Sequence, residues 1–281
     1  MIRNLADIQA LALPDIQELP DTRDIAIQQV GVRDLLYPVK IVDCMNQLQS
    51  SVGTFTLSIG LTSTQKGAHL SRFIQVLEDH SRCFGSDAEG LDSLLSTIQR
   101  SHKAERAFVQ LSFPFFIQKS APQTGSHSLM DYQVGFIAEK RALDEPPHIF
   151  TQVKVPVTSV CPCSKAISAF GAHNQRSMLT LRVKTQQPVP AEHWVALLEQ
   201  QGSAELFALL KRPDEKWVTE KAYENAKFVE DIVRDAAKLL NEDKNVVDYA
   251  LSAENIESIH HHSAFAEITT LSYDALLAEL P

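Results

Sequence analysis

The residues of this chain that could do chemistry gather in its second half. Cys161 and Cys163 flank a proline, His173 follows, and Glu215 and the run His260 to His262 come later. Thiolate, imidazole and carboxylate groups hold divalent ions at catalytic sites, and such a site needs three of them plus an open position for water. Cys161, His173 and Glu215 could fill that role. The sequence therefore favours a metal-dependent enzyme.

These residues do not match the pattern of a structural zinc site. Two cysteines separated by one residue are too close for a zinc knuckle, whose thiols lie two to four residues apart, and no second cysteine pair follows. A cysteine taken alone is more often a packed residue than a ligand. The metal interpretation therefore depends on the whole set.

Composition narrows the class of protein. A chain of 281 residues with 44% hydrophobic content can bury the cores of two ordinary modules. Residues 1–20 carry acidic residues among the apolar ones, so they lack the apolar run of a secretory signal, and no stretch approaches the length of a membrane span. Four cysteines are too few for a disulfide scaffold. We expect a cytoplasmic protein.

Charge argues against a nucleic-acid partner. The formal net charge is -9, and the chain has no long run of Lys or Arg. Binding to a phosphate backbone requires a dense basic surface. A small anionic substrate remains compatible with this charge, because a few local cations can bind a phosphate group.

Hydrophobic periodicity predicts the order ββααββ twice along the chain. In the first half we expect strands at 24–32, 52–61, 106–117 and 132–142, and two amphipathic helices around 70–77 and 91–98. In the second half we expect strands at 148–160, 177–183, 246–252 and 264–270, and helices at 191–200 and 220–241.

This order predicts an α+β fold of two tandem modules, each with an antiparallel sheet and helices packed on one face. Paired prolines place the boundary near residues 144–147. The predicted division is an N-terminal arm at 1–21, extended or poorly ordered, a first module at 22–145, and a second module at 146–281 that carries the metal site.

Further motifs run from about residue 24 to about residue 270. They are Val30-Gly31-Val32, Tyr37-Pro38-Val39, residues 66–73, Pro156-Val157-Thr158 before the Cys-Pro-Cys segment, and residues 211–215, 228–231 and 254–262. As a set they resemble the GTP cyclohydrolase IB family, whose members carry two tunnelling-fold (T-fold) modules in one chain.

The resemblance implies a reaction in which GTP and water give formate and 7,8-dihydroneopterin triphosphate, toward folate and, in many bacteria, modified tRNA bases. It implies that Cys161, His173 and Glu215 hold a divalent ion, Mn²⁺ or Zn²⁺, with Co²⁺ and Fe²⁺ as further candidates. The ion would lower the pKa of its bound water, and the resulting hydroxide would attack C8 of guanine.

The resemblance also implies roles for other residues. Glu230 matches the glutamate that anchors the purine, and Glu257, His260 and His262 lie where the family places acid and base groups. On the residues alone, Glu230 is a solvated glutamate at a helix boundary, and the histidines form a surface cluster.

Lys66, His69, Ser71 and Arg72 precede or open the first amphipathic helix, and cations at a helix N-terminus bind anions. These four residues could bind the triphosphate. In T-fold enzymes the pocket forms between modules or subunits, so this motif could serve the Cys161 site of a neighbouring chain, and the resemblance implies a homotetramer.

Two other functions remain open at this point. One is a T-fold nitrile oxidoreductase, in which a cysteine attacks the substrate and no metal is needed. The other is a purine-binding module without catalysis. Metal analysis would identify the first, and recovery of intact GTP in the presence of metal would identify the second.

Overall fold

The computed structural model describes residues 14–80 and 82–271 and has the α+β fold predicted from the sequence. The strands are β1 (Ile27–Val42), β2 (Leu48–Leu61), β3 (Cys83–Gly85), β4 (Ala107–Ser120), β5 (His127–Lys140), β6 (His148–Val160), β7 (Asn174–Thr185), β8 (Ala204–Glu205), β9 (Val246–Ile256) and β10 (Ala264–Thr269). The helices are the 3-10 helix η1 (Ile16–Glu18) and the α-helices α2 (Ser71–Asp79), α3 (Leu91–His102), α4 (Pro162–Ile167), α5 (Ala191–Glu199), α6 (Arg212–Glu224) and α7 (Val229–Glu242).

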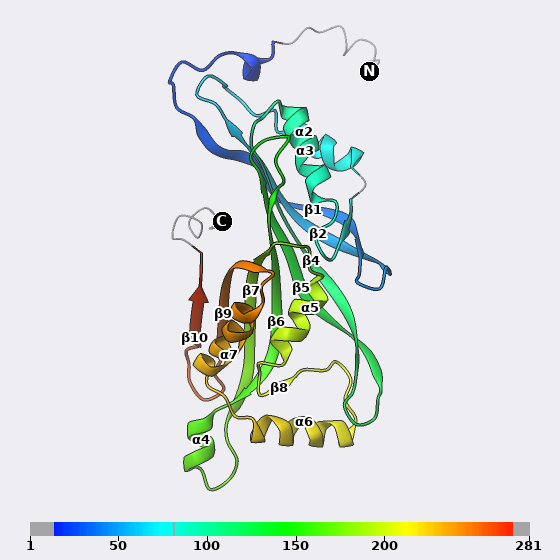
Figure 1. The fold of residues 1–281 in the computed structure, drawn as a ribbon, viewed down its shortest axis with the longest axis vertical. Helices are drawn as coiled ribbons and strands as arrows, with labels where there is room; N and C mark the ends of the chain where they lie inside the picture. The colour runs from blue at the N-terminus through cyan, green and yellow to red at the C-terminus, as the bar shows by residue number, and fades with distance from the viewer. Residues whose placement is uncertain (1–13, 81, 272–281) are drawn as a thin grey trace, which may run out of the picture.

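All of these strands join one sheet (Figure 1). Its order is β10-β9-β7-β6-β5-β4-β2-β1-β3, with β8 paired to β6 outside this path. Neighbours are antiparallel, except that β1 and β3 are parallel. The two predicted halves meet where β5 pairs with β6, and the predicted boundary lies in the turn between them. The modules at 22–145 and 146–281 stay a prediction, and residues 1–13 and 272–281 lie outside the described part.

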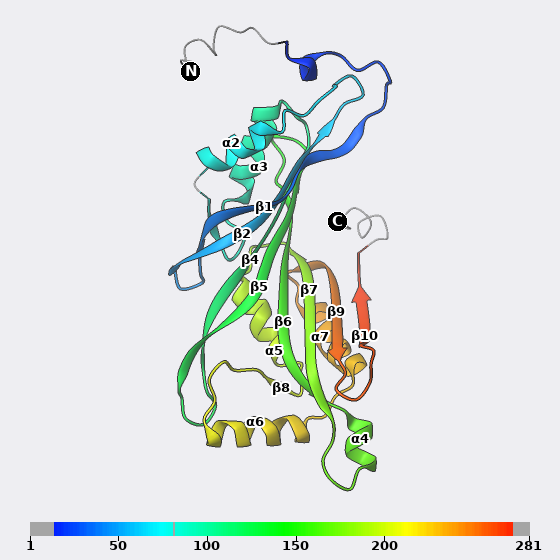
Figure 2. The ribbon, with the colours of Figure 1, turned by 180° about the vertical axis from the view of Figure 1, so that it is seen from behind.

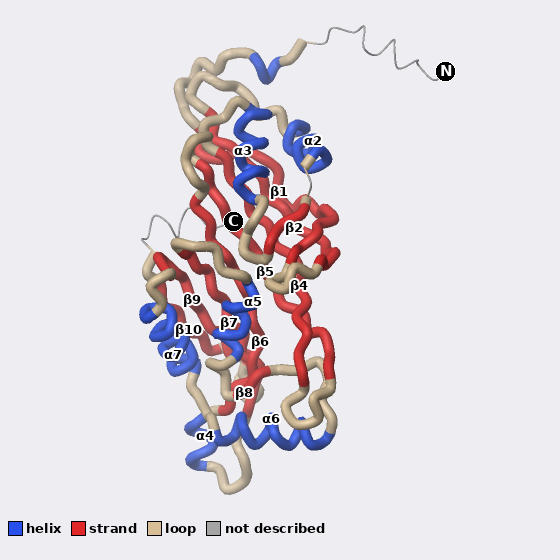
Figure 3. Tube along the Cα trace, turned by 45° about the vertical axis from the view of Figure 1, so that its right-hand side comes forward, coloured by secondary structure: helices blue, strands red, loops and turns tan. Residues whose placement is uncertain are grey.

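One face of the sheet carries the core. Successive side chains on a strand point to opposite faces, so residues in register form rows across the sheet. One such row runs from Phe113 through Val134, Val153 and Leu181 to Leu251, and each side chain is buried. Figure 3 shows α2, α3, α5 and α7 in front of the sheet. Each apolar side chain buried beneath them contributes about 1.5–3 kcal/mol to stability.

The first hairpin is longer than the sequence predicted. β1 continues to Val42 and β2 begins at Leu48, whereas the alternation predicted strands at 24–32 and 52–61. The pairing shifts register between Val32 and Leu35, and Asp34 has a φ of +57°. This bulge breaks the period-two pattern. The alternation of apolar and polar residues therefore ends at the bulge, although β1 continues to Val42.

The chain between β8 and β9 forms two helices where the sequence predicted one at 220–241. α6 ends at Glu224, and α7 begins at Val229. Between them, the Lys227 N–H donates to the Val160 carbonyl oxygen at 3.1 Å, and the Phe228 N–H donates to the Asp231 carboxylate at 3.0 Å. These bonds end one helix and cap the next. The short helix α4 was not predicted.

Part of the N-terminal arm is ordered against the first half. Asp15 accepts a hydrogen bond from Gln17 N at 3.0 Å and begins η1. Pro20 forms a bridge with Gln65, and Asp21 N donates to Thr64 O at 2.9 Å. Residues 20–21 therefore lie against the loop before α2, while residues 1–13 of the predicted arm lie outside the described part. Within the described residues, no helix is long and apolar enough to cross a membrane.

Candidate functional site

Cys161 and His173 lie at the ends of two neighbouring strands. The pairing of β6 with β7 continues one step beyond Val160, through a bond of 3.1 Å from Cys161 N to His173 O. Both side chains are half-buried. Cys161 Sγ accepts a hydrogen bond of 3.4 Å from Ser164 N in the first turn of α4. The register of the sheet thus puts Cys161 opposite His173, the two neighbouring residues that the sequence predicted as ligands.

The His173 ring has three polar or aromatic neighbours. Its Nδ1 lies 3.0 Å from Gln175 Oε1 and 3.8 Å from Glu257 Oε2. Glu257 Oε2 is buried and has no hydrogen-bond partner among the described residues. The His260 ring meets His173 edge-on, with 6.4 Å between centroids. Glu257 and His260, which lie far from His173 in the sequence, therefore join Gln175 beside its ring.

His260 and His262 lie in the turn between β9 and β10, and both are exposed. Their rings stack with 5.3 Å between centroids. His260 thus lies between the rings of His173 and His262.

Glu215 lies apart from this group. It is exposed near the start of α6, whereas the far end of α6 meets α4, where Lys165 Nζ donates to Tyr223 O at 2.5 Å. Eight helical residues separate Glu215 from Tyr223, which is about 12 Å along the helix axis. Among the described residues, no group of three metal-binding side chains with ligand atoms within 4.8 Å of one another includes Cys161, His173 or Glu215.

The neighbouring Asp214 fixes the start of α6. It is fully buried and accepts hydrogen bonds from Lys211 N (3.0 Å), Gln123 N (2.8 Å), Thr124 N (2.9 Å) and Thr124 Oγ1 (2.7 Å). Burial alone would raise the pKa of Asp214, but these hydrogen bonds outweigh it and hold the pKa well below its usual range. The carboxylate ties the turn between β4 and β5 to the helix that carries Glu215.

Glu230 is exposed in the first turn of α7. The chain just before it is bonded to the end of β6 through Lys227 N and Val160 O. Because Val160 precedes Cys161, Glu230 lies in the same end of the molecule as the thiol.

A second group forms a pocket in the N-terminal half. Lys66, His69 and Arg72 line a cavity of about 320 Å³. Ser71 is exposed at the start of α2, beside these residues but not in the lining. His69 has a φ of +47°, in the left-handed region that non-glycine residues seldom adopt, which turns the chain into α2. Three of the four predicted triphosphate-binding residues therefore face one cavity.

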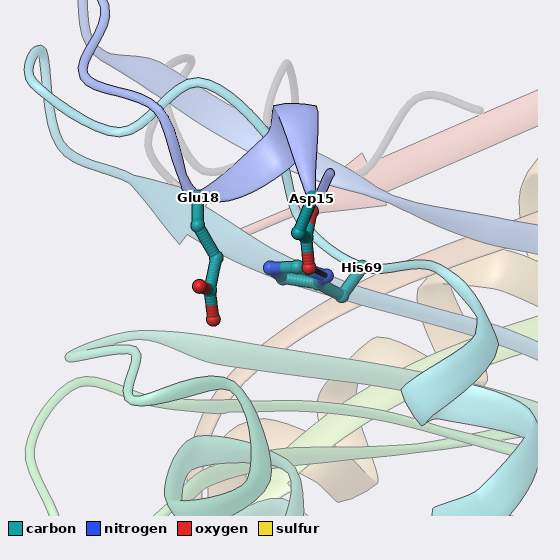
Figure 4. Close-up of side chains that lie close together, drawn as sticks. All are labelled: Asp15, Glu18 and His69. Atoms are coloured by element: carbon teal, nitrogen blue, oxygen red, sulfur yellow. Dashed lines mark ion pairs between the residues drawn. The ribbon is translucent and has the colours of Figure 1, made fainter. Parts of the chain in front are cut away.

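The arm brings two carboxylates near His69 that the sequence analysis did not consider, and one of them, Glu18, lines the pocket. Figure 4 shows Asp15, which caps η1, and Glu18 beside His69. Their ligand atoms lie within 4.8 Å of one another, and His69 Nδ1 is 3.6 Å from Asp15 Oδ2. Both carboxylates are exposed, so water solvates their charge. They offset part of the positive charge of the pocket.

The two groups occupy opposite ends of the molecule. Figures 1 and 2 show α4, which follows Cys161, at one end, and α2, which follows Lys66 and His69, at the other. One chain therefore does not bring the predicted metal ligands and the predicted triphosphate-binding residues to a common site.

Sequence reasoning also missed Gln175, the nearest hydrogen-bond partner of the His173 ring. The available signal was strand alternation, which puts residues two apart on the same face. The partners of Gln175 on other strands depend on register, which the sequence did not supply.

Comparison with known proteins shows the family. The family described as "Type I GTP cyclohydrolase folE2" matches residues 13–266. The GTP cyclohydrolase FolE2 of Janthinobacterium sp. (strain Marseille) is 48% identical over 265 residues, covering 94% of this chain and 97% of the relative. The GTP cyclohydrolase FolE2 of Burkholderia pseudomallei (strain 1710b) is 46% identical over 257 residues, covering 92% of this chain and 95% of the relative.

Solved structures show the same architecture in a distant protein. The uricase of Arthrobacter globiformis superposes with a TM-score of 0.50 at 9% sequence identity, covering 88% of this chain and 94% of the uricase. At this identity the likeness concerns the fold alone. It confirms the T-fold architecture expected from the sequence.

Proposed function

This chain belongs to the type I GTP cyclohydrolase FolE2 family, and we propose that it converts GTP and water to formate and 7,8-dihydroneopterin triphosphate. Within the family we assign it to the IB type with two T-fold modules. The observation that carries the proposal is the convergence of a thiol, imidazoles and a buried carboxylate at one end of the sheet: Cys161, His173, Glu257, His260 and His262.

A divalent metal ion fits this group. Cys161 and His173 are adjacent and supply a soft and a borderline donor, and the buried Glu257 Oε2 lacks a hydrogen-bond partner in the described residues, so a nearby cation would compensate its charge. Cys161, His173 and Glu215 would hold Mn²⁺ or Zn²⁺, with Co²⁺ and Fe²⁺ as further candidates. When bound by these residues, such an ion would lower the pKa of a water molecule and so would make hydroxide available near neutral pH.

Glu257, His260 and His262 are the proposed acid and base groups. Opening the guanine ring at C8 and releasing formate require a proton at a ring nitrogen and removal of protons from the attacking water. Imidazole suits such transfers near neutral pH. The exposed pair His260 and His262 would exchange these protons with solvent, while Glu257 would orient the group around His173.

Substrate binding completes the proposal. Glu230 would accept hydrogen bonds from the guanine edge, and Lys66, His69, Ser71 and Arg72 would hold the triphosphate. Because the N-terminal pocket and Cys161 lie at opposite ends of one chain, a complete site needs residues from a neighbouring chain. Glu215, also distant from Cys161, would be supplied in the same way. We propose a homotetramer.

The membership of the family favours neither alternative function. A nitrile oxidoreductase with a cysteine nucleophile would not need a metal, and a purine-binding module would release GTP unchanged. The same experiment tests all three.

The experiment is to strip the protein with a chelator under reducing conditions, return single ions, and measure formate and the fluorescent oxidised pterin from GTP. We expect activity to vanish with the metal and to return with Mn²⁺ or Zn²⁺. Activity that survives complete removal, or that returns only with Mg²⁺, would overturn the metal proposal, because Mg²⁺ binds oxygen ligands and has no use for a thiolate. Intact GTP under every condition would overturn the catalytic proposal.

A further inference from the structure

A row of buried polar side chains leads from His173 into the core. His173, Gln175 and Ser177 alternate along the chain of β7 and so share one face. The pairing puts Ser159 of β6 opposite Gln175, and Asn255 of β9 opposite Ser177. Gln175, Ser177, Ser159 and Asn255 are between 0% and 7% exposed. On the same face, further along these strands, the row that crosses Val153 and Leu181 is apolar.

Hydrogen bonds connect this row. Gln175 Nε2 donates to Ser159 Oγ at 2.9 Å. Ser177 Oγ lies 2.8 Å from Ser159 Oγ and 2.6 Å from Asn255 Oδ1, and its one hydrogen can be donated to either oxygen. Because the NH₂ group of Gln175 donates to Ser159, the Gln175 carbonyl oxygen faces His173.

We propose that Gln175 is a positioning residue, which holds the His173 ring with its proton on Nδ1 and leaves Nε2 free to bind a metal ion. The inference rests on the metal site of the proposed function. Gln175 Oε1 is 3.0 Å from Nδ1 and can only accept, so Nδ1 must carry the hydrogen. Glu257 Oε2, at 3.8 Å, is beyond hydrogen-bond distance and does not fix the proton.

The buried row explains why an amide can hold this position. An unpaired amide in a core destabilises the fold, so Gln175 could not keep its carbonyl oxygen aimed at the ring unless its NH₂ group had a buried acceptor. Ser159 supplies that acceptor, and Ser177 and Asn255 complete the chain. Residues that orient a ligating histidine in this way typically change metal affinity 10–100-fold when replaced.

The test compares Gln175→Leu with Gln201→Leu. Gln201 is also a buried glutamine, 6% exposed, but its Nε2 donates to Leu197 O rather than to a histidine, so it controls for loss of a buried amide. Zn²⁺ affinity is measured by competition with a chromophoric chelator. We expect Gln175→Leu to bind Zn²⁺ about 10–100-fold more weakly than wild type, and Gln201→Leu to bind it as wild type does. Wild-type affinity in Gln175→Leu would overturn the inference.

A second readout does not depend on the metal. In metal-free protein labelled with ¹⁵N-histidine at pH 8, long-range spectra report which ring nitrogen carries the proton, and His173→Asn identifies the signals of His173. We expect Nδ1–H in wild type and a shift toward Nε2–H in Gln175→Leu. Nε2–H in wild type would overturn the inference. If Cys161→Ala binds Zn²⁺ as tightly as wild type, the proposed metal site fails, while these spectra still decide the role of Gln175.

Discussion

At the scale of one residue, replacing Glu230 tests substrate recognition with little effect on folding. Its side chain is exposed in the first turn of α7, so its removal costs little core packing. If it holds the guanine edge, the loss of two charge-assisted hydrogen bonds should raise KM for GTP at least ~10-fold in Glu230→Ala, with the thermal midpoint nearly unchanged. Glu242→Ala, at the other end of α7, is the control. An unchanged KM and kcat in Glu230→Ala would show that Glu230 is a surface residue.

The buried His102 should make the free energy of unfolding depend on pH. The residue is buried, its Nδ1 lies 3.0 Å from Ile98 O, and its ring lies 4.1 Å from that of Phe73. Burial lowers the pKa of His102 below its usual value. Below pH ~6.5 the unfolded chain therefore binds a proton that the folded chain resists, so the free energy of unfolding falls as pH falls.

Urea unfolding between pH 7 and pH 5 measures this effect. We expect His102→Gln to lose less stability over that interval than wild type does. The same change at the exposed His127 controls for removing a histidine. Equal losses in wild type and His102→Gln would contradict the assigned burial.

Residue types alone pointed to Cys161 and His173 as candidate metal ligands, because thiolate and imidazole bind divalent ions. Glu257 was expected only from the resemblance to the cyclohydrolase family. Gln175 could not be recognised from the sequence, because a single amide in a strand does not indicate a functional role. Its role depends on the strand register, which puts Ser159 opposite it.

Asp214 links elements rather than contacting substrate. Its four hydrogen bonds join the turn between β4 and β5 to the start of α6, and Asp214→Ala would leave three buried or half-buried backbone donors without their acceptor. We expect the thermal midpoint to fall by several degrees and turnover to fall with it, because Glu215 is the next residue. The exposed Asp131→Ala is the control. Wild-type stability in Asp214→Ala would show that the turn and α6 hold their places without this link.

Helices and strands were predictable where one periodic stripe covers the whole element. The stripes of α3 and α7 match their buried residues, because each helix packs one face on the sheet. In α2 the expected stripe began at Leu70, which is exposed and precedes the helix, whereas Phe73 and Leu77 are buried. The break before α7 was not predictable, since it depends on a bond from Lys227 to Val160, a residue far away in the sequence. The second half of β1 was also not predicted, because the bulge between Val32 and Leu35 interrupts the alternation along the strand.

At the scale of the whole molecule, the separation of the two groups predicts complementation between chains. Cys161→Ala and Arg72→Ala should each be inactive, because each lacks one half of the proposed site. Co-expressed in equal amounts, they should form sites in which one chain supplies Cys161 and another supplies Arg72. Random assembly would make roughly a quarter of the sites intact.

Activity of the mixture near a quarter of wild type, measured as formate release, is the expected result. A mixture no more active than its parents would mean that both groups serve the same chain, which would require a rearrangement of the fold. Light scattering on the same samples checks the proposed tetramer.

The most direct test of the account follows the carbon that the reaction removes. GTP labelled with ¹³C at C8 is incubated with metal-loaded wild type and with Cys161→Ala, and the label is followed by NMR. The account predicts that wild type releases all of the label as formate, in equal amount with 7,8-dihydroneopterin triphosphate, and that Cys161→Ala releases none. Label that stays in the purine with wild type, or equal release by both proteins, would contradict it.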